Sequence, residues 1–341
     1  MKSSAPLLTI LLALLLTQAP SSAALAQELE RLPSTSRASH YRLVDGDRRF
    51  DIDLPKGTTP SKGFPTIVIV PGLEVQTEDY SKIRSRLVRE GYAVATFEWK
   101  ENEDYDADDW DDELAELTDL FLAEDRRSGS ALRGKIDEDR LGIMGHSLGG
   151  SVAVLAAARD WRFKALAISG PGGRQTDFLR RARELKIPVI AVDGSLDRVA
   201  PPDEASGVVL ERAQTPYKAH VVIKNGNHRN SPADYDSDYV LDEGRWKMTP
   251  IPFWPFVTYA WTYPKVEGLK PIPSADQRKI AFPYIVGWFD RFVAGKSSDP
   301  NGLANGERAR RELASGKLTR GTYSAAARSG STTGLVGAIN D

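Results

Sequence analysis

The chain has 341 residues, a formal net charge of −2 at pH 7 and no cysteine. With 45 basic and 47 acidic residues it lacks the basic excess that binding to nucleic acid or to an anionic membrane requires, so we expect neither partner. The absence of cysteine excludes disulfide bonds and a thiol nucleophile, and the fold must therefore be stabilised by packing.

The first 26 residues have the pattern of a signal peptide. They contain one lysine, an apolar run from Pro6 to Leu16, and the small-residue triplet Ala24-Leu25-Ala26. The apolar run is shorter than the stretch of about 20 residues that spans a bilayer. We therefore expect cleavage after Ala26, a secreted or periplasmic mature chain, and no stable membrane anchor.

Strand and helix patterns alternate through most of the remaining chain. The expected strands are a hairpin over Tyr41 to Leu54, followed in chain order by FPTIVIVPG, YAVATFEW, LGIM, FKALAIS, IPVIAVDG and KAHVVIK. Helical patterns separate them, among them a helix that Thr77 caps and Gly91 ends, and a longer helix over Asp111 to Glu124. Such alternation predicts an α/β fold with a mostly parallel, doubly wound sheet of about eight strands.

The same patterns divide the chain into a main domain at residues 27–295 and a tail. Within the domain, residues 229–276 are rich in proline and aromatic residues and precede a closing helix in ADQRKIAFPYIVGWFDRFV. This insertion is either a surface excursion or a lid that forms an apolar wall for a ligand. Residues 296–341 show no periodicity and are predicted to be a disordered tail.

A single serine, Ser147, stands in the sharp turn between the LGIM strand and the helix that follows it. The turn, Gly145-His146-Ser147-Leu148-Gly149, matches the G-x-S-x-G pattern of a nucleophile elbow, in which strain exposes the serine hydroxyl. The helix behind it directs N–H groups and the positive end of its dipole toward an anion that forms there. Ser147 is therefore the candidate nucleophile.

A serine nucleophile needs a base, and the base needs an acid that orients it. In proteins with this elbow the acid and then the histidine follow the serine in the chain. Of the four histidines, His40 precedes the serine, His146 lies within the elbow and His220 opens a strand pattern. His228, in the turn after that strand, is the candidate base.

The segment IPVIAVDGSLDRVAPP offers two carboxylates for the acid. Asp197 is preferred because a loop position can reach the imidazole, whereas Asp193, at the strand end, suits a turn cap and is the alternative. The oxyanion of the reaction needs two N–H donors, one after the nucleophile and one in the loop after the first buried strand. These are the backbone groups of Leu148 and Leu73.

The acidic segment ENEDYDADDWDDE, Glu101 to Glu113, lacks the mid-loop glycine and the spaced terminal glutamate of an EF-hand. We expect a solvated loop whose aspartates favour the start of the next helix. No clustered histidine or cysteine indicates a transition metal, and no phosphate-binding loop follows a strand. Neither a cofactor nor a metal is expected.

Four segments carry a resemblance to a known family: TIVIVPGLEVQTEDYSKIRSRLVREGYAVATFEW, IDEDRLGIMGHSLGGSVAV, IPVIAVDGSLDRVAPP and GNHRNS. They resemble the bacterial cutinases and polyester hydrolases, α/β-hydrolases near the dienelactone hydrolase-like and platelet-activating-factor acetylhydrolase-like esterases. The resemblance implies an α/β-hydrolase fold with its catalytic domain at residues 27–295. It also implies a triad and two oxyanion positions, here Ser147, Asp197, His228, Leu73 and Leu148.

The chain departs from this family at three points. Polyester hydrolases commonly have an aromatic residue where this chain has Leu73, and a tryptophan where it has Gly172. Their disulfide near the C-terminus is impossible without cysteine. The insertion at residues 229–276 is a candidate for a different pocket wall.

Taken together, these features predict a secreted serine hydrolase that cleaves carboxylic esters through an acyl-enzyme without a cofactor. The substrate class is a small-molecule, lipid or polymer ester, and no protein partner is implied. The same machinery cleaves amides, so an amidase or peptidase is the nearest alternative. A non-catalytic binding protein of the same fold is the second alternative, because fold does not imply function.

Overall fold

The computed structural model describes residues 28–73, 75–98, 107–172, 177–229, 232–233, 247–253, 256–262, 266–298 and 306–324. The predicted signal peptide and residues 101–106 of the acidic segment lie outside these residues. Within the described parts of the chain, no helix combines the length and the apolar character needed to span a bilayer.

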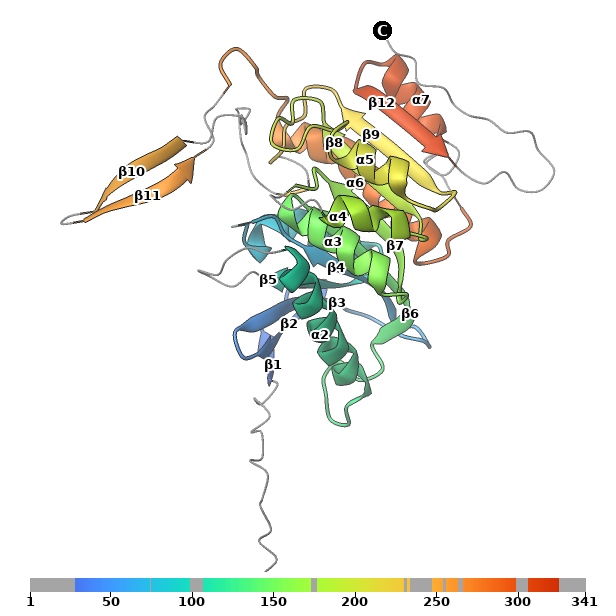
Figure 1. The fold of residues 1–341 in the computed structure, drawn as a ribbon. Helices are drawn as coiled ribbons and strands as arrows, with labels where there is room; N and C mark the ends of the chain where they lie inside the picture. Colours follow the sequence, from blue (N-terminus) through green and yellow to red (C-terminus); the bar gives the residue numbers. More distant parts are fainter. Residues whose placement is uncertain are drawn as a thin grey trace, which may run out of the picture.

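Ten strands form one mixed sheet in the order β1-β2-β3-β5-β4-β6-β7-β8-β9-β12 (Figure 1). Their bounds are β1 Glu28–Leu32, β2 Ala38–Asp45, β3 Arg48–Pro55, β4 Phe64–Val70, β5 Ala93–Glu98, β6 Ile136–His146, β7 Phe163–Ser169, β8 Val189–Gly194, β9 Lys218–Ile223 and β12 Leu318–Ser324. The six strands from β5 to β9 in this order pair in parallel, whereas β1, β2, β3 and β12 pair antiparallel with their neighbours. The predicted α/β fold is confirmed, and all the expected strands are present.

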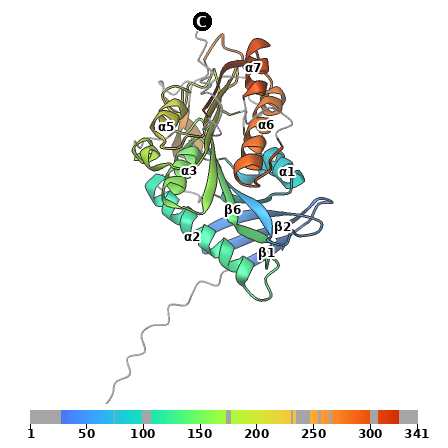
Figure 2. The same cartoon turned by 90° about the vertical axis from the view of Figure 1, so that its right-hand side faces the viewer.

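Helices cover both faces of the sheet. Those with residues described are α1 Ser81–Arg89, α2 Ala107–Arg126, α3 Leu148–Arg159, α4 Asp177–Arg181, α5 Ser206–Arg212, α6 Ser274–Phe292 and α7 Glu307–Ala314, with 3-10 turns at Thr77–Tyr80 (η1) and Ala182–Glu184 (η2). Figure 2 shows α2, α3 and α5 on one side of the sheet and α1 and α6 on the other. This two-sided cover explains why the central strands are apolar without alternation.

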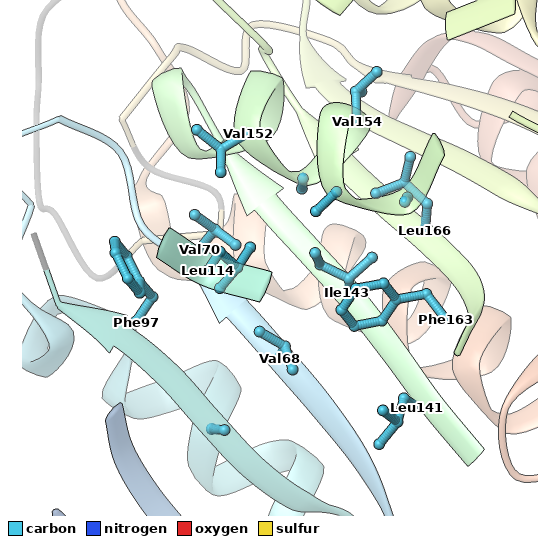
Figure 3. Packing of buried hydrophobic residues seen from close by; sticks show 14 of the residues in the cluster. Val68, Val70, Phe97, Leu114, Leu141, Ile143, Val152, Val154, Phe163 and Leu166 are labelled. Carbon is cyan, nitrogen blue, oxygen red and sulfur yellow. The ribbon is translucent and has the colours of Figure 1, made fainter. Parts of the chain in front are cut away.

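Two buried clusters, one on each face of the sheet, form the core. On the first face, Val70 and Ile143 of the central strands pack with Leu114 of α2 and Val152 of α3 (Figure 3). On the second, residues of α1 and α6 such as Leu87 and Phe289 pack against the opposite side of the same strands. All seven residues of β4 are buried, as the apolar run in the sequence predicts. The core thus holds the carboxyl ends of the parallel strands in fixed positions.

The prediction of a disordered tail is wrong for residues 306–324. Here α7 packs on the sheet and β12 pairs antiparallel with β9, so that the sheet gains an edge strand. Ala309 and Leu318 are buried, and a Cβ on Gly321 would lie 2.9 Å from the Cβ of Ala309. The sequence pattern does not reveal this helix, because the few apolar residues of ERARRELA stand among charged ones. Residues 325–341 lie outside the described part of the chain.

The insertion contains a separate two-stranded antiparallel sheet, β10 Lys247–Phe253 and β11 Phe256–Thr262 (Figure 1). The closing helix α6 begins at Ser274, slightly earlier than predicted. Much of the insertion between Arg229 and β10 lies outside the described residues. A role as a lid therefore stays a prediction.

Candidate active site

The elbow is strained at Ser147 itself. β6 ends immediately before this residue and α3 begins immediately after it, and the serine has φ 56° and ψ −128°. Positive φ is costly for a residue with a side chain, so the packing around the turn must impose it. A Cβ on Gly145 would lie 2.1 Å from the carbonyl oxygen of Gly149, and a Cβ on Gly149 would lie 2.1 Å from that of Pro71. The two glycines of the motif are therefore required by the close backbone approach.

Hydrogen bonds tie the elbow to the loop after β7. The Ser147 N–H donates to the carbonyl of Ser169 (3.0 Å), and the Ser147 carbonyl accepts from the N–H groups of Gly150 (2.8 Å) and Gly172 (3.1 Å). Leu148 is the first residue of α3, where an N–H has no acceptor within the helix. Its N–H is thus suited to a ligand oxygen, as the sequence predicts.

The loop that carries Leu73 lies against the elbow. A Cβ on Gly72 would be 3.2 Å from the Cβ of Ser147, which is a tight contact, so glycine suits this close approach of the loop. Leu73 itself is partly buried and packs on the core cluster of the α2 and α3 face. The structure therefore brings both predicted oxyanion residues, Leu73 and Leu148, next to Ser147.

His228 and Asp197 form a buried pair. His228 Nδ1 and Asp197 Oδ2 are 2.7 Å apart, and both side chains are largely inaccessible. Since a carboxylate only accepts hydrogen bonds, the proton between them is on Nδ1, which leaves Nε2 as the nitrogen that can act as the base. Asp197 Oδ1 accepts from the N–H groups of Val199 (3.0 Å) and Ala200 (2.8 Å). These bonds fix the orientation of the carboxylate.

Gly170 joins this pair to the elbow. It has φ 49°, and a Cβ at this position would lie 2.7 Å from Asp197 Oδ2 and 3.0 Å from His228 Nδ1. Gly170 directly follows Ser169, whose carbonyl accepts from the Ser147 N–H. One short loop therefore contacts all three residues of the predicted triad. They stand at the carboxyl ends of parallel strands, where α/β folds place their ligands.

The alternative acid, Asp193, is bound to other partners. Its Oδ2 accepts from His220 Nε2 (2.8 Å), and its Oδ1 accepts from the Gly170 N–H (2.8 Å) and the Ser206 hydroxyl (3.0 Å). Asp193 thus caps the turn at Gly170 and holds a second histidine. The geometry favours Asp197 as the partner of His228.

Two buried side chains of this region were missed by the sequence analysis. His146 Nδ1 lies 2.9 Å from the hydroxyl of Tyr80, and His146 Nε2 lies 2.8 Å from the carbonyl oxygen of His228. Burial, and to a smaller extent the repulsion that a protonated His228 would exert, lowers the pKa of His146 to about 3, so this imidazole is neutral near pH 7. The sequence signal for His146 is its place inside the elbow, next to Ser147, whereas no local pattern indicates Tyr80.

A cavity of about 390 Å³ lies at the far end of α3, beside Trp161. Arg159 and Arg162 line it, and both are already paired, Arg159 with Asp111 (2.8 Å) and Arg162 with Asp160 (2.6 Å). Both guanidinium groups are thus held by carboxylates, and none of the predicted catalytic residues lines this cavity.

Among the described residues, no group of three or more histidine, cysteine, aspartate or glutamate side chains could hold a metal ion. Asp111, within the acidic segment, is buried and paired with Arg159 instead of lying in a solvated loop.

The fold and this arrangement define the α/β-hydrolase class. The chain belongs to the PET hydrolase-like family, whose family model matches residues 20–238. The matched segment contains Ser147, Asp197 and His228, and the resemblance predicted from the sequence is confirmed at the level of the family.

Two curated relatives agree with this membership. The chain is 30% identical over 146 residues to a bis(hydroxyethyl) terephthalate hydrolase of Streptomyces coelicolor, which is 42% of this chain and 44% of the relative. It is 24% identical over 166 residues to cutinase est1 of Thermobifida alba, which is 48% of this chain and 53% of the relative. The match thus spans about half the length of each relative.

Proposed function

We propose that this protein is an exported serine hydrolase that cleaves carboxylic esters through an acyl-enzyme. The observation that carries the proposal is the buried His228–Asp197 pair, which Gly170 joins to the strained elbow of Ser147. The names of the two relatives, a terephthalate ester hydrolase and a cutinase, support an ester as the substrate.

In the proposed reaction, the Ser147 hydroxyl attacks the ester carbonyl while His228 Nε2 takes its proton. Asp197 stabilises the imidazolium that forms, and the N–H groups of Leu73 and Leu148 bind the oxyanion. His228 then donates the proton to the leaving alkoxide, and the acyl group remains on Ser147. Water hydrolyses this acyl-enzyme by the same proton path, and none of these steps needs a cofactor.

One relative is named for an aromatic diester, so bis(hydroxyethyl) terephthalate is a substrate to test together with simple acyl esters. At the position where the related polyester hydrolases commonly have a tryptophan, a Cβ on Gly172 would have its nearest neighbour, the Cβ of Ala200, at 3.6 Å, which is ordinary contact. Packing therefore does not require glycine at this position.

Export is proposed from the signal-peptide pattern of the first 26 residues. Expression with the native N-terminus, followed by N-terminal sequencing of the protein outside the cytoplasm, should give a mature chain that begins at Gln27. A chain that keeps residues 1–26 and stays in the cytoplasm would overturn this part of the proposal.

The experiment that tests the catalytic proposal is hydrolysis of p-nitrophenyl esters from acetate to palmitate and of bis(hydroxyethyl) terephthalate, with matched anilides. We expect ester turnover that is lost in Ser147→Ala and kept in the control Ser151→Ala, a serine of the same helix whose hydroxyl donates to the Gly172 carbonyl. Anilide turnover at a comparable rate would instead indicate an amidase. Failure of every substrate, with no labelling by a fluorophosphonate, would indicate a binding protein.

A further inference from the structure

We propose that Tyr80 and His146 are positioning residues that hold the Gly72–Leu73 loop and the backbone of His228 at a fixed spacing around Ser147. The inference rests on the proposed function, since it concerns the same nucleophile, base and oxyanion donors. Neither side chain would touch the substrate. Each acts through the groups it binds.

A continuous chain of hydrogen bonds carries the proposal. The Gly72 N–H donates to the Tyr80 hydroxyl oxygen (3.0 Å), the hydroxyl lies 2.9 Å from His146 Nδ1, and His146 Nε2 lies 2.8 Å from the His228 carbonyl oxygen. The Tyr80 and His146 side chains are buried, so the chain is shielded from water. It connects η1, the end of β6 and the loop after β9, which are far apart in sequence.

The direction of every bond in this chain is determined. A carbonyl oxygen only accepts, so the proton of the last bond is on His146 Nε2. Burial keeps His146 neutral, because it lowers the pKa of this imidazole to about 3, and Nδ1 must then accept the hydroxyl proton of Tyr80. The Tyr80 oxygen is left to accept from Gly72. Removing one member therefore leaves a neighbour without the bond it is oriented to make.

Both ends of this hydrogen-bond chain lie at groups next to or within the proposed catalytic residues. Gly72 precedes Leu73, whose N–H is the proposed oxyanion donor, and the His228 carbonyl belongs to the proposed base. His146 is itself the residue before Ser147. Reaction rates depend on the placement of such groups to within about 0.5 Å, so a link between the two loops controls whether donor and base are correctly placed together.

The His228 loop has a second support that does not reach the oxyanion loop. The Asn227 N–H donates to Gln277 Oε1 of α6, at 3.2 Å. This bond anchors the His228 loop to α6, and it does not fix the distance between that loop and Gly72. Among the hydrogen bonds described for this region, the path through His146 and Tyr80 joins the two loops directly.

The test is Tyr80→Phe, with Tyr92→Phe as a matched control. Tyr92 is also buried, and its hydroxyl donates to Asp290 Oδ1 at 2.8 Å, away from the elbow. We expect Tyr80→Phe to lower kcat about tenfold, the factor that corresponds to one hydrogen bond, with KM changed less than about twofold. Tyr92→Phe should lower the melting temperature about as much as Tyr80→Phe does, and it should leave kcat unchanged. Each kcat is calculated per active site, and the active sites are counted by titration with a fluorophosphonate.

A pair of variants at position 146 separates positioning from packing. His146→Phe removes both hydrogen bonds, whereas His146→Gln keeps a donor and an acceptor, so we expect the second to recover part of the kcat that the first loses. Wild-type kcat in Tyr80→Phe, or an equal loss of kcat in Tyr92→Phe, would overturn the inference.

A measurement that does not depend on turnover keeps this inference distinct from the proposed function. In ¹⁵N NMR spectra, the wild-type His146 should remain the neutral Nε2–H tautomer at every pH well above its pKa of about 3. In Tyr80→Phe, its Nδ1 resonance should move to the position of a nitrogen without a donor. An inactive wild type with these signals would refute the ester hydrolase alone, whereas a His146 that titrates near neutral pH would refute the hydrogen-bond chain.

Discussion

Replacing Asp197 with asparagine changes a single atom of the buried pair, and we expect it to remove most of the activity. In the wild type, Oδ2 accepts from His228 Nδ1 while Oδ1 accepts from the N–H groups of Val199 and Ala200. An asparagine amide has only one oxygen to serve both sets of donors. The orientation of that amide determines the tautomer of His228.

The two backbone donors decide the orientation. If the amide NH₂ faced Val199 and Ala200, two N–H groups would lose their acceptor, at about 1–3 kcal/mol each. The NH₂ group should therefore face His228 Nδ1, which must then accept, and the proton moves to Nε2. An imidazole protonated on Nε2 cannot take the proton of Ser147, and a wrong tautomer of this kind costs a Ser-His-Asp triad ~10⁴-fold in kcat.

The assay is kcat for a p-nitrophenyl ester, with Asp193→Asn as the control. The same chemical change at Asp193 acts on His220 and on the cap of Gly170, so it should lower the melting temperature while kcat falls less than about tenfold. If Asp197→Asn keeps more than about a tenth of the wild-type kcat, or if Asp193→Asn is the more damaged variant, the assignment of the acid is wrong.

Two further predictions concern stability. Gly149→Ala should prevent folding or lower the melting temperature strongly, because the new Cβ would lie 2.1 Å from a backbone oxygen. In the control Gly150→Ala, the nearest atom to the new Cβ is 3.0 Å away, so the melting temperature should fall less. Equal melting temperatures in the two variants would refute the argument that Gly149 is required by close backbone approach. Burial lowers the pKa of His146 from 6.5 in the unfolded chain to about 3, so its contribution to stability is complete above pH 6.5 and is lost as pH falls toward 3. Thermal unfolding across this range should show a weaker pH dependence in His146→Gln, and an unchanged slope would contradict the neutral, buried imidazole.

The strands at the sheet edges show which feature of the fold an amino-acid pattern does not predict, namely the pairing of strands. The central strands could be predicted because burial on both faces demands a continuous apolar run, as in FPTIVIV and VIAVDG. The edge strands ELERL and LTRGTYS have mixed polarity, because each is covered only in part. Their pairing depends on an available neighbour, β2 for the first and β9 for the second, and a local pattern does not contain that information.

The site was predictable where chemistry imposes a local pattern. The elbow is such a case, because its glycines are required by close contacts within the turn and with β4. The choice between Asp193 and Asp197 was not settled by spacing, because both follow the same strand and only the fold shows that each holds a different histidine. The role of Tyr80 could not be predicted from the sequence for the same reason, because it depends on which loops lie side by side in the fold.

Peptide mapping by mass spectrometry, after reaction of the mature protein with a fluorophosphonate, would identify the nucleophile directly. We expect a single adduct on the peptide that contains Ser147, formed at a rate that falls strongly in His228→Gln, together with loss of ester hydrolysis in proportion to labelling. An adduct on another residue, or ester hydrolysis that persists after Ser147 is fully labelled, would contradict the assignment of Ser147 as the nucleophile.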